Sequence, residues 1–318
     1  MIRPLRAVAP LVRILPRSAP ALATAAWLAL VSALASASSI PEMFFPELGA
    51  LASVVFASPG SSWARAPLLL TLTPAITAVP GVLITRLLPY GLPALALDLV
   101  ICLLLIRWLR SPIVPAISAG MLPLTLGITS WLYPPAILVG TGGLALLSQL
   151  RARWRPLPPS APLLPHGPVR VWAPALALFL LGGAGLVHLF GSRLVLYPPL
   201  FVIAFEMLTL RDHCPWSGRP GAVLLVTGGA ALAGLLLVRS LGVVPLAVAA
   251  AVLVTALLLH LARLRCPPAY GLALLPFLIP SPSLSYLLFT LIGTSWLLLV
   301  VATSAALARR RGDREWQD

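Results

Sequence analysis

Long apolar stretches, separated by short segments that carry most of the charge, occupy nearly the whole chain. A membrane-spanning helix needs about 20 predominantly apolar residues to cross ~30 Å of hydrocarbon. Stretches near that length cover residues 21–40, 43–58, 66–88, 92–109, 112–130, 132–150, 171–190, 194–210, 222–241, 243–261, 267–282 and 285–307. This pattern predicts an all-α protein, a polytopic bundle of membrane helices.

Composition supports the bilayer as the solvent of this chain. Of 318 residues, 59% are hydrophobic and 9% charged, which leaves too little polar surface for a soluble globular enzyme. The formal charge of +14 does not indicate nucleic-acid binding, because the arginines lie between apolar stretches rather than among polar and aromatic residues. Lys and Asn are absent, which is typical of a GC-rich bacterial genome and favours a bacterial inner membrane.

Arginines gather in alternate gaps between the apolar stretches, and basic residues accumulate in cytoplasmic loops. They are Arg3, Arg6, Arg13, Arg17, Arg65, Arg107, Arg110, Arg151, Arg153, Arg155, Arg211, Arg219, Arg263, Arg265, Arg309, Arg310, Arg311 and Arg314. We therefore expect the basic tail 1–18, the Pro/Arg-rich linker 151–170 and the tail 309–318 to be cytoplasmic. Residues 33–37 also resemble a signal-peptide cleavage site, but the corresponding apolar stretch 171–190 favours a retained first helix.

Identical residues recur 153 positions apart, in one unbroken register. The pairs are Pro46 with Pro199, Trp63 with Trp216, Pro67 with Pro220, Gly81 with Gly234, Arg86 with Arg239, Arg110 with Arg263, Pro115 with Pro268, Pro123 with Pro276, Tyr133 with Tyr286, Gly140 with Gly293, and Thr141 with Thr294. Such self-similarity predicts a duplicated unit of about six membrane segments, in repeats 19–150 and 171–308. Because both tails and the linker are expected on one side, the repeats should run parallel, with a site between them.

Two segments of each repeat are poor candidates for helices that cross the whole membrane. Stretch 43–58 is short, and stretch 112–130 contains Pro112, Pro115 and Pro123. Proline removes a backbone donor, so these segments are interpreted either as broken or re-entrant elements or as kinked helices. Interrupted segments at corresponding positions of two halves indicate a binding site.

Two stretches resemble the HPP family of integral membrane proteins, which is named for a His-Pro-Pro motif. Residues 45–50, followed by Pro59, Trp63 and Pro67, are similar to the family's Pro-x-Leu-Gly-Ala segment and the polar loop after it. The name-giving motif is similar to Cys266, Pro267, Pro268, Ala269, Tyr270 and Gly271, and the corresponding residues of the first repeat are Ile113, Val114, Pro115 and Ala116. Neither copy has the family's His, so the chain resembles a divergent, duplicated relative. Some plant and cyanobacterial members are regarded as nitrite transporters, so the resemblance implies transport of a small anion.

Three acidic residues within or beside the apolar stretches are candidates for a substrate or proton path. A carboxylate such as Asp98 costs roughly 2.5–3.5 kcal/mol at the centre of a membrane helix, so it indicates either a functional residue or a structural acid that is protonated or paired with Arg. Glu47 begins a short segment, where it would cap a helix or line the path. Glu206 would form an ion pair with Arg211 or a proton site, and Ser53 is its counterpart.

The remaining polar and small residues have structural alternatives. Arg86 and Arg239 would attract anions at the outer mouth or extend to lipid headgroups. Gly140 and Gly293, each followed by Thr, favour close helix packing. His188 has no second ligand nearby, and the three cysteines are far apart, so we expect no metal and no cofactor.

The leading functional hypothesis is a transporter or facilitator for a small solute, with nitrite as an example of an inorganic anion. A noncatalytic membrane scaffold or assembly protein is the alternative. An intramembrane enzyme is not favoured, because no metal cluster, Ser–His pair or phosphate-binding loop is present. Besides lipid and solute, a second copy of the chain is an acceptable partner.

Overall fold

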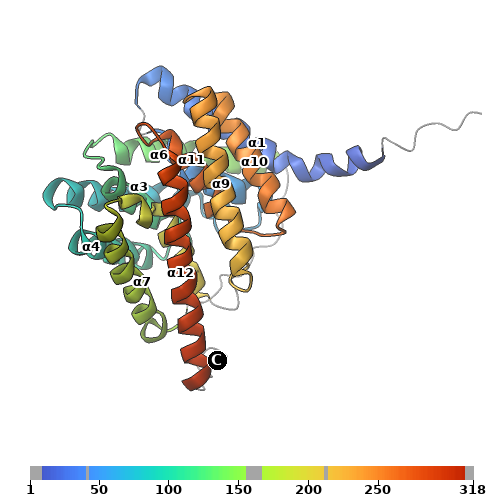
Figure 1. Cartoon of the computed structure of the whole chain (residues 1–318). Helices are drawn as coiled ribbons and strands as arrows, with labels where there is room; N and C mark the ends of the chain where they lie inside the picture. Colours follow the sequence, from blue (N-terminus) through green and yellow to red (C-terminus); the bar gives the residue numbers. More distant parts are fainter. Residues whose placement is uncertain (1–8, 41–42, 155–166, 211–213, 312–318) are drawn as a thin grey trace, which may run out of the picture.

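The computed structural model describes residues 9–40, 43–154, 167–210 and 214–311 (Figure 1). In these ranges the chain is helical and contains no strand. Its first half forms α1 (Ala9–Ser38), α2 (Glu47–Ala57), α3 (Pro67–Leu87), α4 (Leu92–Trp108), α5 (Ala116–Leu126) and α6 (Tyr133–Trp154). Its second half forms α7 (Val169–Phe190), η2 (Arg193–Leu196), α8 (Pro198–Thr209), α9 (Pro220–Leu241), α10 (Pro245–Leu261), α11 (Pro268–Leu274), η4 (Leu275–Phe277) and α12 (Leu284–Arg311).

Proline and left-handed residues set many of the helix boundaries. α3, α8, α9, α10 and α11 have proline in their first two positions, where the missing N–H has no helical partner to lose. α5 and α7 end at Gly127 and Gly191, whose φ values of 73° and 64° suit glycine. α4 and α10 end alike, because Arg110 and Arg263 both have φ 49°.

Five helices are long and apolar enough to cross a membrane: α1 from Ser18 onward, α3, α7, α9 and α12. Their outer faces carry exposed leucines, such as Leu30, Leu83, Leu181, Leu236 and Leu299. Apolar exposure on so many helices is unfavourable in water and favourable against lipid. The described part of the chain is therefore all-helical, and its apolar exterior is that expected of a membrane protein.

The short helices lie inside, and the long ones surround them. α2 of the first half packs against α11 of the second, and α5 packs against α8. α1 lies along α10, and α9 lies beside α12 at the front of Figure 1. Each half therefore contributes helices to the interior of the other.

Several observed boundaries differ from the expected ones. α1 begins at Ala9, within the expected tail 1–18, and α6 extends to Trp154, into the expected linker 151–170. The stretch 112–130 contains a helix of only 11 residues, α5. Pro115 precedes α5 and Gly127 ends it, so the apolar stretch is longer than its helix.

Arginine contacts distinguish the two ends of the bundle. At one end Arg151 donates to the carbonyl of Phe56, 2.9 Å away, and Arg219 donates to the carbonyls of Ala262 and Arg263. We call this the arginine-rich end, and it also contains the C-terminal ends of α2, α6 and α10.

Candidate functional site

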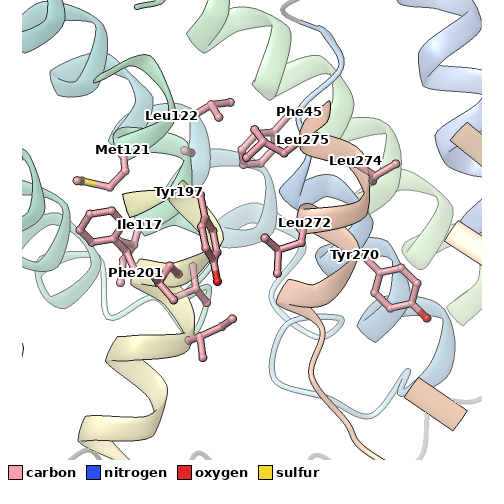
Figure 2. Close-up of a cluster of buried hydrophobic side chains, with 14 of the residues drawn as sticks. Phe45, Ile117, Met121, Leu122, Tyr197, Phe201, Tyr270, Leu272, Leu274 and Leu275 are labelled. Atoms are coloured by element: carbon pink, nitrogen blue, oxygen red, sulfur yellow. The ribbon is translucent and has the colours of Figure 1, made fainter. Parts of the chain in front are cut away.

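The interior of the bundle is formed by α2, α5, α8 and α11, which have 11, 11, 12 and 7 residues. Twelve helical residues extend only ~18 Å, well short of the ~30 Å of hydrocarbon. Every residue of α8 and α11 is buried. Figure 2 shows Phe201 of α8 beside Ile117 of α5, and Tyr197, the residue before α8, on the side that faces Leu272 of α11. Half-length helices of both halves thus meet at the centre.

Glu47, the first residue of α2, lies at this centre and is 1% exposed. Ser118 of α5 lies next to its carboxyl group, but the two do not meet hydrogen-bond geometry. On the other side, a Cβ at Gly271 of α11 would lie 3.8 Å from Glu47 Cδ and 3.0 Å from Pro199 Cγ. Both carboxyl oxygens of Glu47 lack a hydrogen-bond partner among the described residues.

Two tyrosines on long helices flank this carboxyl group. Tyr133 on α6 donates to the carbonyl of Ala119, 3.0 Å away, and Tyr286 on α12 donates to that of Leu272, 2.6 Å away. Both phenol groups are within electrostatic reach of Glu47. The hydroxyls hold α5 and α11 in place on either side of Glu47.

Asp98 on α4 is fully buried at a separate position. The thiol of Cys102 donates to its Oδ1, 3.8 Å away, whereas Oδ2 lacks a partner and faces Gly120 of α5. Ser118 and Gly120 are two residues apart, so they point to nearly opposite faces of α5. α5 therefore lies between Asp98 and Glu47.

Glu206 on α8 is 7% exposed and lies toward the end of that helix. It is seven residues from Pro199, which corresponds to about two helical turns and nearly the same face. Cys266, directly before α11, and Cys214 are within electrostatic reach of it. Arg211, its expected ion-pair partner, lies outside the described residues.

Cys214 lies in the segment between α8 and α9, near the Glu206 carboxyl group. Burial raises the pKa of its thiol to about 12, and the nearby Glu206 adds to this rise. Cys214 is therefore a neutral thiol at neutral pH.

Buried charge in the described residues is entirely acidic. Among the residues whose burial the structure describes, Glu47, Asp98 and Glu206 are the buried carboxyl groups, and no arginine or histidine is buried. Each unpaired buried polar atom costs about 1–3 kcal/mol, so such groups require an explanation. Retention of unpaired carboxyl groups at the centre is typical of function within membranes.

The two outer arginine candidates differ in their contacts. Arg86 donates to the carbonyl of Thr129, 2.8 Å away, and lies over the Trp131 ring. Its counterpart Arg239 is exposed and has no such contact within the described ranges. Arg193, nearby, lies over Tyr90 at 4.7 Å, and burial raises the pKa of that phenol while Arg193 opposes the rise. Arg86 and Arg193 therefore have packing roles.

The proline motif residues lie at the interior helices. Pro115 and Ala116 begin α5, and Pro123 is inside it. Cys266 and Pro267 precede α11, which begins at Pro268, and Pro276 lies in η4. Gly140 packs against Leu48, and Gly293 against the Val195 carbonyl. The proline-containing segments at Pro115 and Pro268 thus form the starts of the short helices α5 and α11. Their side chains do not hydrogen-bond to Glu47.

A groove of about 230 Å³ opens between α1, the segment before α2, the loop before α10 and η4. Ser32, Ser36, Phe44, Val243 and Phe277 are among its lining residues. Val243 precedes α10, whose other end is the arginine-rich end, so the groove opens away from that end. The rings of Phe44 and Phe277 meet edge to face at 6.2 Å, and Phe44 is three residues before Glu47. The groove therefore lies where the chain approaches the start of α2, and Glu47 itself is not among its lining residues.

Ser118, Gly271, Tyr133 and Tyr286 are neighbours of Glu47 that the sequence patterns above do not predict. The two tyrosines could have been singled out from the sequence, because they are identical residues 153 positions apart. Ser118 and Gly271 could not, because helix packing alone brings them to Glu47.

No family model, curated protein or solved structure matches the chain, so the resemblance to the HPP family rests on the sequence motifs alone.

Proposed function

We propose that the protein is a transporter or facilitator of a small solute, with its path through the interior where α2, α5, α8 and α11 meet. The carrying observation is Glu47, a buried carboxyl group with two unpaired oxygens between helices of both halves. Intramembrane ionisable residues that face a bundle interior are by default functional. The groove that ends at Phe44 and Phe277 would be the entrance on one side.

We also infer that the chain consists of two parallel copies of one unit, as a divergent relative of the HPP family. Local geometry that recurs 153 residues apart supports this inference. Arg110 and Arg263 share φ 49°, and Gly81 and Gly234 each touch a backbone carbonyl, that of Gly120 and that of Ala273. A duplicated unit of this kind would place the solute between the copies. The arginine distribution favours an inner-membrane location with both termini in the cytoplasm.

A flux assay tests the transport proposal. The purified protein would be reconstituted in liposomes, and the uptake of nitrite, nitrate, formate and monovalent cations measured. Flux of one solute that is lost in Glu47→Gln would support the proposal. The matched control is Thr303→Ala, which removes an exposed hydroxyl bonded only to its own helix. Wild-type vesicles that pass none of these solutes would overturn it and favour a scaffold role.

A further inference from the structure

The charge of the interior conflicts with an anion as the ligand of the central site. The buried ionisable groups at α2 and α8 are carboxyl groups, and the described arginines lie at the helix ends and in the loops between helices. An anion would face a like charge whenever Glu47 is ionised, and no arginine or histidine is described as buried beside it. Groups at low dielectric feel such repulsion strongly. A cation is therefore the complementary ligand.

We propose that Glu47 and Glu206 are two proton-binding stations on the seam between α8 and α11, so that the transport proposed above is coupled to protons. This inference rests on the proposed function and names its coupling ion. α11 packs along α8: Gly271 lies against Pro199 beside Glu47, and Cys266, near the start of α11, is within electrostatic reach of Glu206.

The two stations lie at different depths. Pro199 and Glu206 are seven residues apart, or about 10 Å along the axis of α8. Glu47 lies at the centre, three residues beyond the groove residue Phe44. Glu206 lies near the C-terminal end of α8, with Cys214 of the following loop within reach, and keeps 7% of its surface exposed. A proton would reach Glu47 from the groove and Glu206 from the opposite end of the seam.

The groups that surround these stations are weak acids. Glu47 has Tyr133 of α6 and Tyr286 of α12 within electrostatic reach, and Tyr270 of α11 packs on α2 through Gly49. α5 contributes no ionisable side chain there. Cys214 and Cys266 are titratable groups within electrostatic reach of Glu206, and residues 211–213 lie outside the described residues.

A proton fits this arrangement better than a metal ion. Metal ions are held by several ligands that surround one point. Among the described residues, no three His, Cys, Asp or Glu side chains form such a group. A proton needs one carboxyl oxygen at a time. It leaves the carboxylic acid of one station and binds the carboxylate of the other, so the transfer is balanced without a further reactant.

The packing between the stations explains why protons would not leak. The α8 residues between Pro199 and Glu206 are apolar and buried, among them Leu200, Phe201 and Ile203. A proton cannot cross this layer without hydrogen-bonding groups or water. The observed conformation is thus closed between the stations, and passage would require the seam to open.

Infrared spectroscopy of the full-length protein in lipid membranes tests the two stations directly. The C=O stretch of a protonated carboxyl group would be followed while the pH is changed. We expect titrating bands in the wild type, with one band lost in Glu47→Gln and another in Glu206→Gln. Thr303→Ala is the matched control, because it removes an exposed hydroxyl bonded only to its own helix and leaves every carboxyl group in place. Absence of titrating bands at Glu47 and Glu206 would overturn the proposal, whether or not the protein transports a solute.

Proton movement gives the second readout. Vesicles with an internal pH-sensitive dye would be placed under a gradient of the solute found in the flux assay. The wild type should change internal pH as solute moves, and Glu47→Gln or Glu206→Gln should slow that change by roughly a hundredfold, as expected for loss of a proton-transfer group. Solute flux with no pH change would overturn the proton coupling and leave the transport proposal standing. Titrating bands in a protein that passes no solute would retain the proton sites and overturn the transport proposal.

Discussion

The two halves of the molecule agree in their backbone contacts and differ in their interior chemistry. Tyr133 and Tyr286 each donate to a carbonyl 14 residues earlier, and α4 and α10 end at arginines with the same φ. At the counterpart positions of Glu47 and Asp98, however, the second half has Leu200 and Ala251. The shared contacts are backbone and packing contacts, whereas the differences fall at the acidic residues on which the proposed function depends.

The largest expected effect comes from the two glycines that touch backbone. A Cβ at Gly81 would overlap the Gly120 carbonyl, and one at Gly234 would overlap the Ala273 carbonyl. Gly81→Ala and Gly234→Ala should each cost at or above the upper end of the ~1–3 kcal/mol typical of overpacking. The thermal midpoint in detergent would measure this.

Gly185→Ala is the matched control, because nothing lies within 4 Å of a Cβ there. If Gly81→Ala and Gly234→Ala lowered the thermal midpoint by clearly different amounts, the two halves would not share this contact.

Tyr133→Phe and Tyr286→Phe should have the next largest effect. Each removes one buried hydrogen bond and leaves a carbonyl without its donor, at about 1–2 kcal/mol. We expect the two losses of stability to be similar in thermal unfolding. Only Tyr133→Phe should also alter the surroundings of Asp98. Tyr133 is within electrostatic reach of Asp98, and Tyr286 is not. A stability loss confined to one tyrosine would contradict the shared role.

Sequence patterns located the full-length helices well and the interior poorly. The expected stretches 66–88 and 92–109 correspond to α3 and α4 within one residue at each end, because proline, glycine and arginine mark the ends of these apolar runs. Glu47 was expected at the outer start of a segment. Its burial depends on α11 from the other half, and such a contact between distant segments leaves no local pattern.

Replacing Glu47 with its counterpart residue sharpens the comparison of function. Glu47→Leu removes unpaired buried oxygens, so the protein should unfold at an unchanged or higher temperature, with a gain of up to about 1 kcal/mol. Flux in vesicles should be lost at the same time. Retained flux would place function elsewhere than in the difference between the halves.

The smallest effect is expected at the outer arginines. Arg86→Ala removes a hydrogen bond to Thr129 and a contact with Trp131, which should lower stability by less than about 1 kcal/mol. Arg239→Ala should cause no measurable change in thermal midpoint. A clear loss in Arg239→Ala would reveal a contact that the described residues do not account for.

The crossed packing of α2 on α11 and of α5 on α8 has a consequence for biogenesis. A ribosome releases residues 1–154 well before α8 and α11 exist. During that interval the first half lies in the bilayer without the helices that cover α2 and α5. Glu47 then lacks its contact with α11. Completion of the interior is therefore delayed until the last third of the chain has been synthesised, and the two halves, produced as separate polypeptides, should each be incomplete until they meet.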